Sequence, residues 1–307
     1  MSATSPGPHL VGTSPAHLQL LETLDRVAPI DAEVLIAGPT GVGKELYASY
    51  IHQHSLRAKA PCVPVNCAAL PPELIENELF GHVAGAFTGA RPSTAGLVAE
   101  AEGGTLFLDE IDSLPVGCQA KLLRFLNEKE YRRLGQTKLL RANVRIIAAT
   151  NADLAAAVQA KAFRQDLFFR LRVVPIEVPA LARRREDIPL LLDEFADRYS
   201  EAYRRPRIVL GKRALARLMS YAWPGNIREL ENCVKYLTCL QLSRPVDPYD
   251  LPLLDDEPKP EIPPLEVLVD SGPLKTVKRD LVVQFERAYL ENALRRSGGN
   301  IAAAARA

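Results

Sequence analysis

Short apolar runs alternate with longer amphipathic stretches over the first 180 residues of the chain. Residues 16–28 repeat apolar positions at helical spacing, and residues 34–37 form a short apolar run that ends at Gly38. This spacing predicts a helix for the first segment and a buried strand for the second. A further helix is predicted at 43–55. Further strands are predicted at 62–66, 104–109, 144–149 and 173–178. Strands that alternate with helices predict an α/β layer with a mostly parallel sheet.

The pattern becomes purely helical after Pro179, which predicts a second, smaller helical domain. Between Pro245 and Pro264 the chain carries seven prolines and little periodicity, as is typical of a linker. A helical pattern returns afterwards. The predicted division is a disordered lead at 1–8, an α/β part at 9–180, a helical lid at 181–244, a linker at 245–273 and a last helical segment at 274–307.

Composition narrows the possible classes of protein. The 307 residues include 38 basic and 37 acidic side chains, so the balanced charge argues against a protein that coats polyanions. We find no apolar run of about 18 residues, and the first residues do not resemble a signal peptide. The five cysteines are irregularly spaced, which favours reduced, buried thiols over disulfides or zinc ligands. These features favour a cytoplasmic protein without a membrane span.

A glycine-rich loop between the first predicted strand and the next helix indicates phosphate binding. It reads Gly38, Pro39, Thr40, Gly41, Val42, Gly43, Lys44 and Glu45. Glycines allow backbone N–H groups to point at phosphates, and the helix N-terminus adds positive potential. Lys44 is expected to reach the β- and γ-phosphates of a nucleotide. Glu45 stands where Ser or Thr commonly holds magnesium, so Mg²⁺ must depend more on phosphates, water and other carboxylates.

Two acids, Asp109 and Glu110, end a strongly apolar strand. One carboxylate can hold Mg²⁺ and its water, which assigns the metal to Asp109, and the other can polarise an attacking water. The alternative is a pair of helix-capping acids. Asn66 ends another predicted strand and could hydrogen-bond Glu110, or it could be an ordinary turn residue. Asn151 closes the strand at 144–149, where an amide can orient water beside a γ-phosphate.

The arginines are harder to interpret from sequence alone. Arg164 and Arg170 lie six residues apart on a helical segment, and solvated surface side chains are the favoured interpretation. The basic runs at 183–185 and 204–207 are likewise expected to be solvated. Residues 223–230 open a helix, with Pro224 and Gly225 setting a turn and Asn226 available as a cap.

Residues 78–90 contain the most specific string of the chain. Its last part reads Gly85, Ala86, Phe87, Thr88, Gly89 and Ala90. The small residues suit a mobile, exposed tip that offers Phe87 and Thr88 outward. With the phosphate loop, Glu45 and the acid pair, this string resembles the AAA+ bacterial enhancer-binding proteins that activate sigma-54 RNA polymerase. Val83 and Ala84 differ from the charged pair usual there.

The resemblance implies an AAA+ P-loop ATPase with a helical lid, which uses ATP and Mg²⁺ in a ring, by analogy a hexamer. It implies that Asn66 restrains Glu110, that Asn151 senses the nucleotide, and that Arg164 and Arg170 reach a neighbouring subunit's γ-phosphate. It also implies that Arg228 ties the lid to the nucleotide. Further implied sites are an adenine-side wall (Val11, Gly12 and Ile188), the sigma-54 contact at Gly85–Ala90 and a supporting loop at 131–140.

The last part of the chain, from Leu281, resembles the first two helices of a Fis-type helix-turn-helix, without the recognition helix that would enter DNA. Enhancer DNA is therefore an expected partner of a longer protein. The expected function is an ATP-driven activator that remodels the sigma-54 polymerase at a closed promoter. A general AAA+ protein remodeller and a DNA-binding regulator independent of sigma-54 remain as alternatives.

Overall fold

A computed structural model describes residues 10–86, 93–253, 278–279 and 282. The chain divides into two units, Met1–Pro252 and Leu253–Ala307, and the elements and contacts of the described structure belong almost entirely to the first. The predicted helical segment at 274–307, which includes the helix-turn-helix, lies almost entirely outside the described residues. The boundaries of the predicted domains stay predictions.

Five parallel strands form the central sheet, as the sequence predicts. They are β1 (Val34–Ala37), β2 (Cys62–Asn66), β3 (Thr105–Asp109), β6 (Arg145–Thr150) and β7 (Val174–Glu177). Their order across the sheet is β2-β3-β6-β1-β7, and every pairing is parallel. A small antiparallel hairpin joins β4 (Glu130–Tyr131) to β5 (Leu140–Arg141). The carboxyl ends of β1, β3 and β6 therefore meet at one edge of the sheet.

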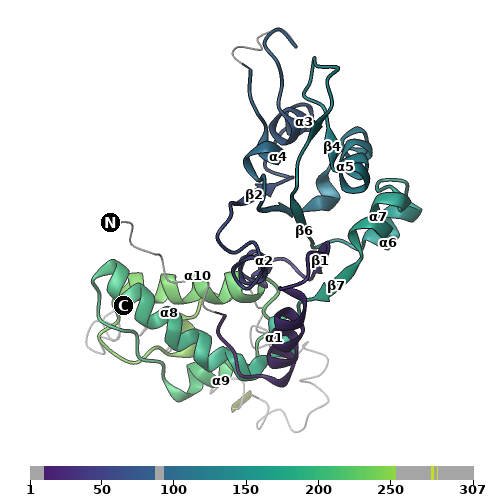
Figure 1. Cartoon of the computed structure of the whole chain (residues 1–307). Coiled ribbons are helices and arrows are strands. Elements are labelled where there is room, and N and C mark those ends of the chain that lie inside the picture. Colours follow the sequence, from purple (N-terminus) through teal and green to yellow (C-terminus); the bar gives the residue numbers. More distant parts are fainter. Residues whose placement is uncertain (1–9, 87–92, 254–277, 280–281, 283–307) are drawn as a thin grey trace. The chain divides into compact units, whose positions relative to one another are not determined.

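Helices cover both faces of this sheet (Figure 1). The helices of the α/β part are α1 (Pro15–Val27), α2 (Lys44–Gln53), α3 (Pro72–Phe80), α4 (Leu97–Glu100), α5 (Val116–Glu128), α6 (Leu154–Gln159) and α7 (Gln165–Leu171). Those of the lid are α8 (Ile188–Tyr203), α9 (Lys212–Ser220) and α10 (Asn226–Leu240). Short 3-10 turns occupy Ile111–Ser113, Leu181–Arg183, Arg185–Asp187 and Pro248–Asp250.

Successive side chains of the central strands point to opposite faces of the sheet and pack into two separate hydrophobic cores. Leu106 and Leu108 pack with α3, α5 and α7, whereas Phe107 between them packs with α1 and α2. This is the period-two alternation of a strand that is buried on both faces. Helix α1 begins with Ser14, whose hydroxyl accepts the His17 N–H, and Pro15 occupies its first turn.

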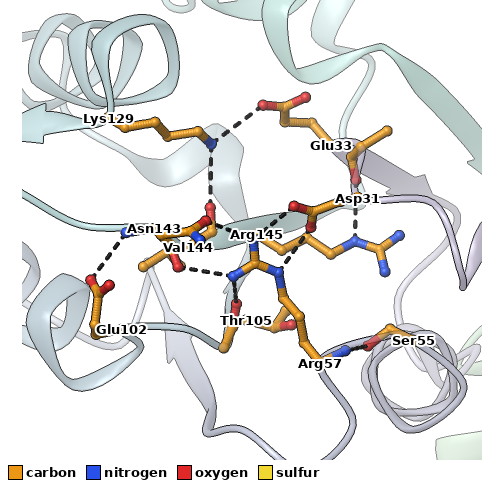
Figure 2. A network of polar contacts seen from close by, with 12 residues as sticks. Asp31, Glu33, Ser55, Arg57, Glu102, Thr105, Lys129, Asn143, Val144 and Arg145 are labelled. Carbon is orange, nitrogen blue, oxygen red and sulfur yellow. Dashed lines mark hydrogen bonds and ion pairs between the residues drawn. The ribbon is translucent and has the colours of Figure 1, made fainter.

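A buried arginine closes the other end of α1. The Arg145 guanidinium donates to the carbonyls of Val27, Ala28 and Ala32, the closest at 2.7 Å. Carbonyls at a helix end lack intrahelical donors, so this cation stabilises the end of α1 against the sheet. Burial lowers the pKa of Arg145, and the Asp31 carboxylate opposes that shift. Figure 2 shows the surrounding polar network, which includes Arg57.

Among the described residues, no helix combines the length and the apolar character needed to span a membrane. The five thiols are free; Cys67, Cys118 and Cys233 are buried. Cys62 and Cys239 are exposed, so the prediction of buried thiols is wrong for these two.

Candidate functional site

Five consecutive carbonyls of the glycine-rich loop accept hydrogen bonds from the protein. Lys44 Nζ donates to the carbonyls of Gly38 (2.8 Å) and Pro39 (3.2 Å). The other three carbonyls are those of Thr40, Gly41 and Val42. Their donors are Asn226 Nδ2 at 2.9 Å, the Arg228 backbone N–H at 3.2 Å and Arg184 Nη2 at 3.3 Å.

This arrangement fixes the direction of the loop's N–H groups. In a trans peptide the N–H points opposite to the preceding carbonyl. The carbonyls of Thr40, Gly41 and Val42 are turned toward donors outside the loop, so the N–H groups of the three residues that follow them are turned toward the centre of the loop. Gly41 and Gly43 adopt positive φ angles of 79° and 89°. Left-handed residues placed along a loop in this way allow successive N–H groups to converge on one side. Successive inward amides at the start of α2 form a cradle that can hold a phosphate anion.

Lys44 lies at the base of this cradle and is buried. Burial lowers the pKa of Lys44, and the carboxylates of Asp109, Glu110 and Asp112 oppose that shift. The lysine and the acids at the end of β3 therefore share one electrostatic environment. Glu45 follows Lys44 and is exposed.

Glu110 holds an unusual backbone conformation directly after β3. Its φ and ψ are 51° and 48°, and its N–H donates to Asp109 Oδ1 at 3.0 Å. A non-glycine residue in the left-handed region stores strain, and such strain is concentrated at functional sites. Two carboxylates therefore stand on consecutive residues at the carboxyl end of β3, the second of them in the left-handed region.

The donor set suits magnesium. Mg²⁺ in nucleotide sites takes one or two carboxylates, with phosphate oxygens and water completing its shell. Asp109 and Glu110 provide carboxylates beside the loop. No group of three or more metal-ligating side chains occurs among the described residues, so no all-protein cage competes with this arrangement. A bound Mg²⁺ would offset phosphate charge, with Asp109 as its protein ligand.

Asn66 is the last residue of β2 and Asn151 follows β6, so both lie at the carboxyl ends of the strands, on either side of β3. Their side chains make different contacts. Asn66 pairs in register with Asp109, yet its Oδ1 accepts the N–H groups of Ala68 and Ala69 at 2.9 and 3.0 Å. In this structure Asn66 therefore makes the contacts of a turn residue. Asn151 Nδ2 donates to Thr40 Oγ1 at 3.0 Å, which joins β6 to the phosphate loop.

The structure brings Val11 and Gly12 next to Ile188. The connection is Asp187, a fully buried carboxylate that accepts the N–H groups of Thr13 and Ser14, both at 2.7 Å. A Cβ on Gly12 would lie 2.8 Å from Asp187 Oδ2, so only glycine fits this approach. The segment before α1 is thus fixed to the start of the lid, where a wall for a nucleobase is expected.

Asn226 does not cap α10, contrary to the sequence prediction. Its φ is 54°, and its amide spans two elements, since Nδ2 donates to Thr40 O while Oδ1 accepts the Leu181 N–H at 2.8 Å. The Glu229 carboxylate accepts a hydrogen bond from the Gly225 N–H at the start of α10 instead, at 2.8 Å. The lid therefore contacts the phosphate loop directly, and the Arg228 side chain lies close enough to affect Lys44 electrostatically.

Asn226→Ala is expected to lower the free energy of unfolding by about 2–4 kcal/mol, because it leaves the buried Leu181 N–H and the Thr40 carbonyl without partners. Urea unfolding followed by circular dichroism measures this. Thr23→Ala, which removes only an exposed hydroxyl bonded to Gln19 O, is the control and is expected to change stability by under about 0.5 kcal/mol. A loss for Asn226→Ala as small as that of the control would contradict the bridging role.

The two candidate finger arginines lie at opposite ends of α7. Arg164 precedes the helix and forms a two-point ion pair with Asp166, at 3.0 and 2.7 Å. Arg170 lies in the last turn and donates to Leu126 O at 3.0 Å. Its guanidinium also lies 3.6 Å from Glu33, which precedes β1. Because the phosphate loop follows β1, Arg170 lies at the edge of the sheet opposite to its own loop.

The stem of the Gly85–Ala90 loop contacts the second loop, as expected. Leu134 donates to Gly81 O at 2.9 Å and accepts the Val83 N–H at 3.1 Å. A Cβ on Gly135 would lie 2.8 Å from the Ala86 side chain. Gly85 has a φ of 80°. Phe87, Thr88, Gly89 and Ala90 lie outside the described residues.

The sequence analysis missed several side chains of this region. Arg184 was expected in a solvated basic run, but it is 1% exposed and donates to Tyr47 Oη at 3.1 Å as well as to the loop. Asp112 accepts the Thr150 hydroxyl at 2.6 Å and so links the acidic strand end to β6. Asp187 was also missed. Each acts through partners far away in the chain, which no local pattern reveals.

Fold and site together define a P-loop α/β protein with a helical lid that contacts the phosphate loop. Residues 10–177 match the family model described as the sigma-54 interaction domain, and the chain belongs to this family. Residues 182–263 match the AAA+ ATPase lid domain, and residues 282–307 match the bacterial regulatory proteins of the Fis family. The family and fold class inferred from the sequence are thereby confirmed.

Individual relatives agree with this assignment. The chain is 46% identical over 298 residues to the transcriptional regulatory protein ZraR of Escherichia coli K12, covering 97% of this chain and 65% of the relative. It is 50% identical over 222 residues to AlgB, an alginate biosynthesis regulator of Pseudomonas syringae, covering 72% and 50%. The crystal structure of NtrX from Brucella abortus with ATP matches with a TM-score of 0.77 and 39% identity, covering 97% and 66%. The chain thus spans about 65% of the length of ZraR.

Proposed function

We propose that this chain is the ATP-hydrolysing part of a sigma-54-dependent transcriptional activator that works in the cytoplasm. The observation that carries the proposal is the set of three carbonyls at residues 40–42 that bond to donors outside the loop, which turns the following amides inward beside Lys44 and two carboxylates. NtrX, a similar protein, has been crystallised with ATP and with ADP. ATP fits the same cradle here, with the base against Val11, Gly12 and Ile188.

The proposed division of labour follows the geometry of the loop. The inward amides and Lys44 hold the phosphates, and Asp109 holds Mg²⁺. Glu110 accepts a proton from the attacking water, and Asn151 orients that water and reports the state of the γ-phosphate to Thr40. When the site is idle, the Asn66 side chain leaves the Ala68 and Ala69 N–H groups and forms a hydrogen bond with Glu110 instead. In these roles, charged and polar groups are preorganised around the phosphates before the reaction begins. Such electrostatic preorganisation is the main source of catalysis in phosphoryl transfer.

Arg164 and Arg170 act on a neighbouring subunit in this proposal. Arg170 lies at the amino end of β1, away from its own phosphate loop, so a second chain must bring a γ-phosphate to it. The partner is a homo-oligomeric ring, by analogy a hexamer. Arg228 links the lid to the bound nucleotide within one subunit.

The protein partner proposed for the Gly85–Ala90 loop is sigma-54 RNA polymerase. Nucleotide can drive remodelling only if the loop prefers sigma-54 in one nucleotide state. The backbone bonds between Leu134 and residues 81 and 83 tie the loop stem to the second loop, which gives a physical route for such a preference. The proposed role of the Fis-type segment at 282–307 is to bind enhancer DNA.

The test is binding of the chain to purified sigma-54 with ADP–aluminium fluoride, which mimics the transferring phosphoryl group, and with ADP alone. We expect a complex only with the mimic, detected by gel filtration. The Thr88→Ala variant is expected to hydrolyse ATP normally while losing the complex. ATPase activity without sigma-54 binding in either state would favour a general AAA+ remodeller.

A further inference from the structure

Three charged side chains meet at the amino end of β1, outside the phosphate site. The Glu33 carboxylate forms ion pairs with two cations. Arg170 Nη2 lies 3.6 Å from Glu33 Oε1, and Lys129 Nζ lies 3.8 Å from the same oxygen. The Glu33 side chain is only 13% exposed. Lys129 also donates to the Val144 carbonyl at 3.3 Å, and Figure 2 shows it between Glu33 and Val144. One carboxylate therefore serves two cations from different helices.

Arg170 is held loosely in this cluster. Its Nε is buried and has no hydrogen-bond partner, and its distance to Glu33 exceeds that of a hydrogen bond. The Leu126 carbonyl provides the one short contact, at 3.0 Å. Arg164, by contrast, uses two nitrogens on Asp166. A guanidinium with one unused, buried donor can gain more from a phosphate, which accepts two parallel hydrogen bonds.

We propose that Glu33 is a positioning residue that holds Arg170 on its own subunit and releases it to a neighbouring subunit's γ-phosphate, while Lys129 stays on Glu33. The inference rests on the proposed role of Arg170 as a finger in trans. It adds an acid and a lysine that act only through that arginine. Glu33 precedes β1, at the end of that strand opposite to the phosphate loop.

The second cation is what makes release possible. Removing the sole partner of a mostly buried carboxylate leaves an uncompensated charge, which is strongly unfavourable. With Lys129 in place, Glu33 remains paired after Arg170 has moved. Without Lys129, Arg170 becomes the one cation within 4 Å of Glu33 among the described residues, with Arg145 acting from farther away, and Arg170 is held more tightly. The two side chains are therefore expected to affect turnover in opposite directions.

The test measures ATP turnover per assembled subunit for Glu33→Gln, Lys129→Met and the double variant. Glu33→Gln is expected to raise turnover and Lys129→Met to lower it, each by about two- to five-fold, the range of an ion pair that is longer than a hydrogen bond and partly exposed on its cationic side. The double variant is expected to turn over like Glu33→Gln, since Lys129 has no role once the carboxylate is gone. Light scattering measures assembly, and circular dichroism confirms folding.

Glu128→Gln is the matched control, because it neutralises an exposed acid of α5 that pairs with Arg124 and is expected to change nothing. A lower turnover for both single variants would mean that the cluster only stabilises the fold and would overturn the inference. So would unchanged turnover for Glu33→Gln. Normal turnover of Arg170→Ala would instead remove the proposed finger itself, which separates failure of the function from failure of this inference.

Discussion

Glu110→Gln is expected to bind ATP as tightly as the unchanged chain and to hydrolyse it about 10²–10⁴-fold more slowly, the usual contribution of a positioned general base. Glutamine keeps the size of the side chain but cannot accept a proton from water at neutral pH. The phosphate cradle, Lys44 and Asp109 are untouched, so affinity is expected to persist.

Two measurements on the same protein separate these effects. Equilibrium binding of a fluorescent ATP analogue reports affinity, and phosphate release at saturating ATP reports turnover. Glu22→Gln, an exposed acid of α1, is the control for loss of one negative charge. Turnover within about two-fold of the unchanged chain would remove Glu110 as the residue that activates water and leave Asp109 as the acid to examine.

Arg170→Ala is expected to lower turnover by about 10³–10⁵-fold, the range for arginine fingers in other nucleotide hydrolases. The loss should be recovered by mixing. A chain with Arg170→Ala keeps its own Lys44 and Glu110, whereas a chain with Glu110→Gln keeps its finger. In a mixed ring some sites combine both intact halves, so two nearly inactive proteins are expected to hydrolyse ATP together.

The mixing experiment measures phosphate release across a range of ratios of the two variants. Arg172→Ala is the control, because Arg172 lies two residues away and stacks on the Phe168 ring at 5.7 Å. A mixture that assembles, binds ATP and stays inactive would show that Arg170 does not act between subunits.

Most of the sheet could be predicted because each strand carries its signal within itself. In β3 and β6, runs of buried side chains lie between polar ends, and the predicted bounds differ from the observed ones by a residue. The phosphate loop and the acids of β3 were equally visible, since glycine spacing and a carboxylate after an apolar run are local features. The lid helices followed from helical periodicity alone.

The contacts that organise the site could not be predicted in the same way. Arg184 and Asn226 each donate to a loop more than 130 positions away in sequence, and the sequence shows only a basic run and a turn. The left-handed backbone of Glu110 also has no local sequence signal, because glutamate has no intrinsic preference for a positive φ. Local patterns predicted the candidate catalytic groups, and tertiary contacts determine how their side chains and backbone are held.

The five occupied carbonyls of the phosphate loop have one more consequence, for how small a working fragment can be. Two of these carbonyls accept hydrogen bonds from Lys44. The other three accept them from Arg184, Arg228 and Asn226, which follow the α/β part in the chain. A fragment that ended at residue 180 would keep the whole glycine-rich string and lose the donors that orient most of it. The orientation of the loop is therefore encoded twice, once in the motif and once some 140 to 190 residues later, and we expect a fragment with only the first stretch to bind phosphate more weakly.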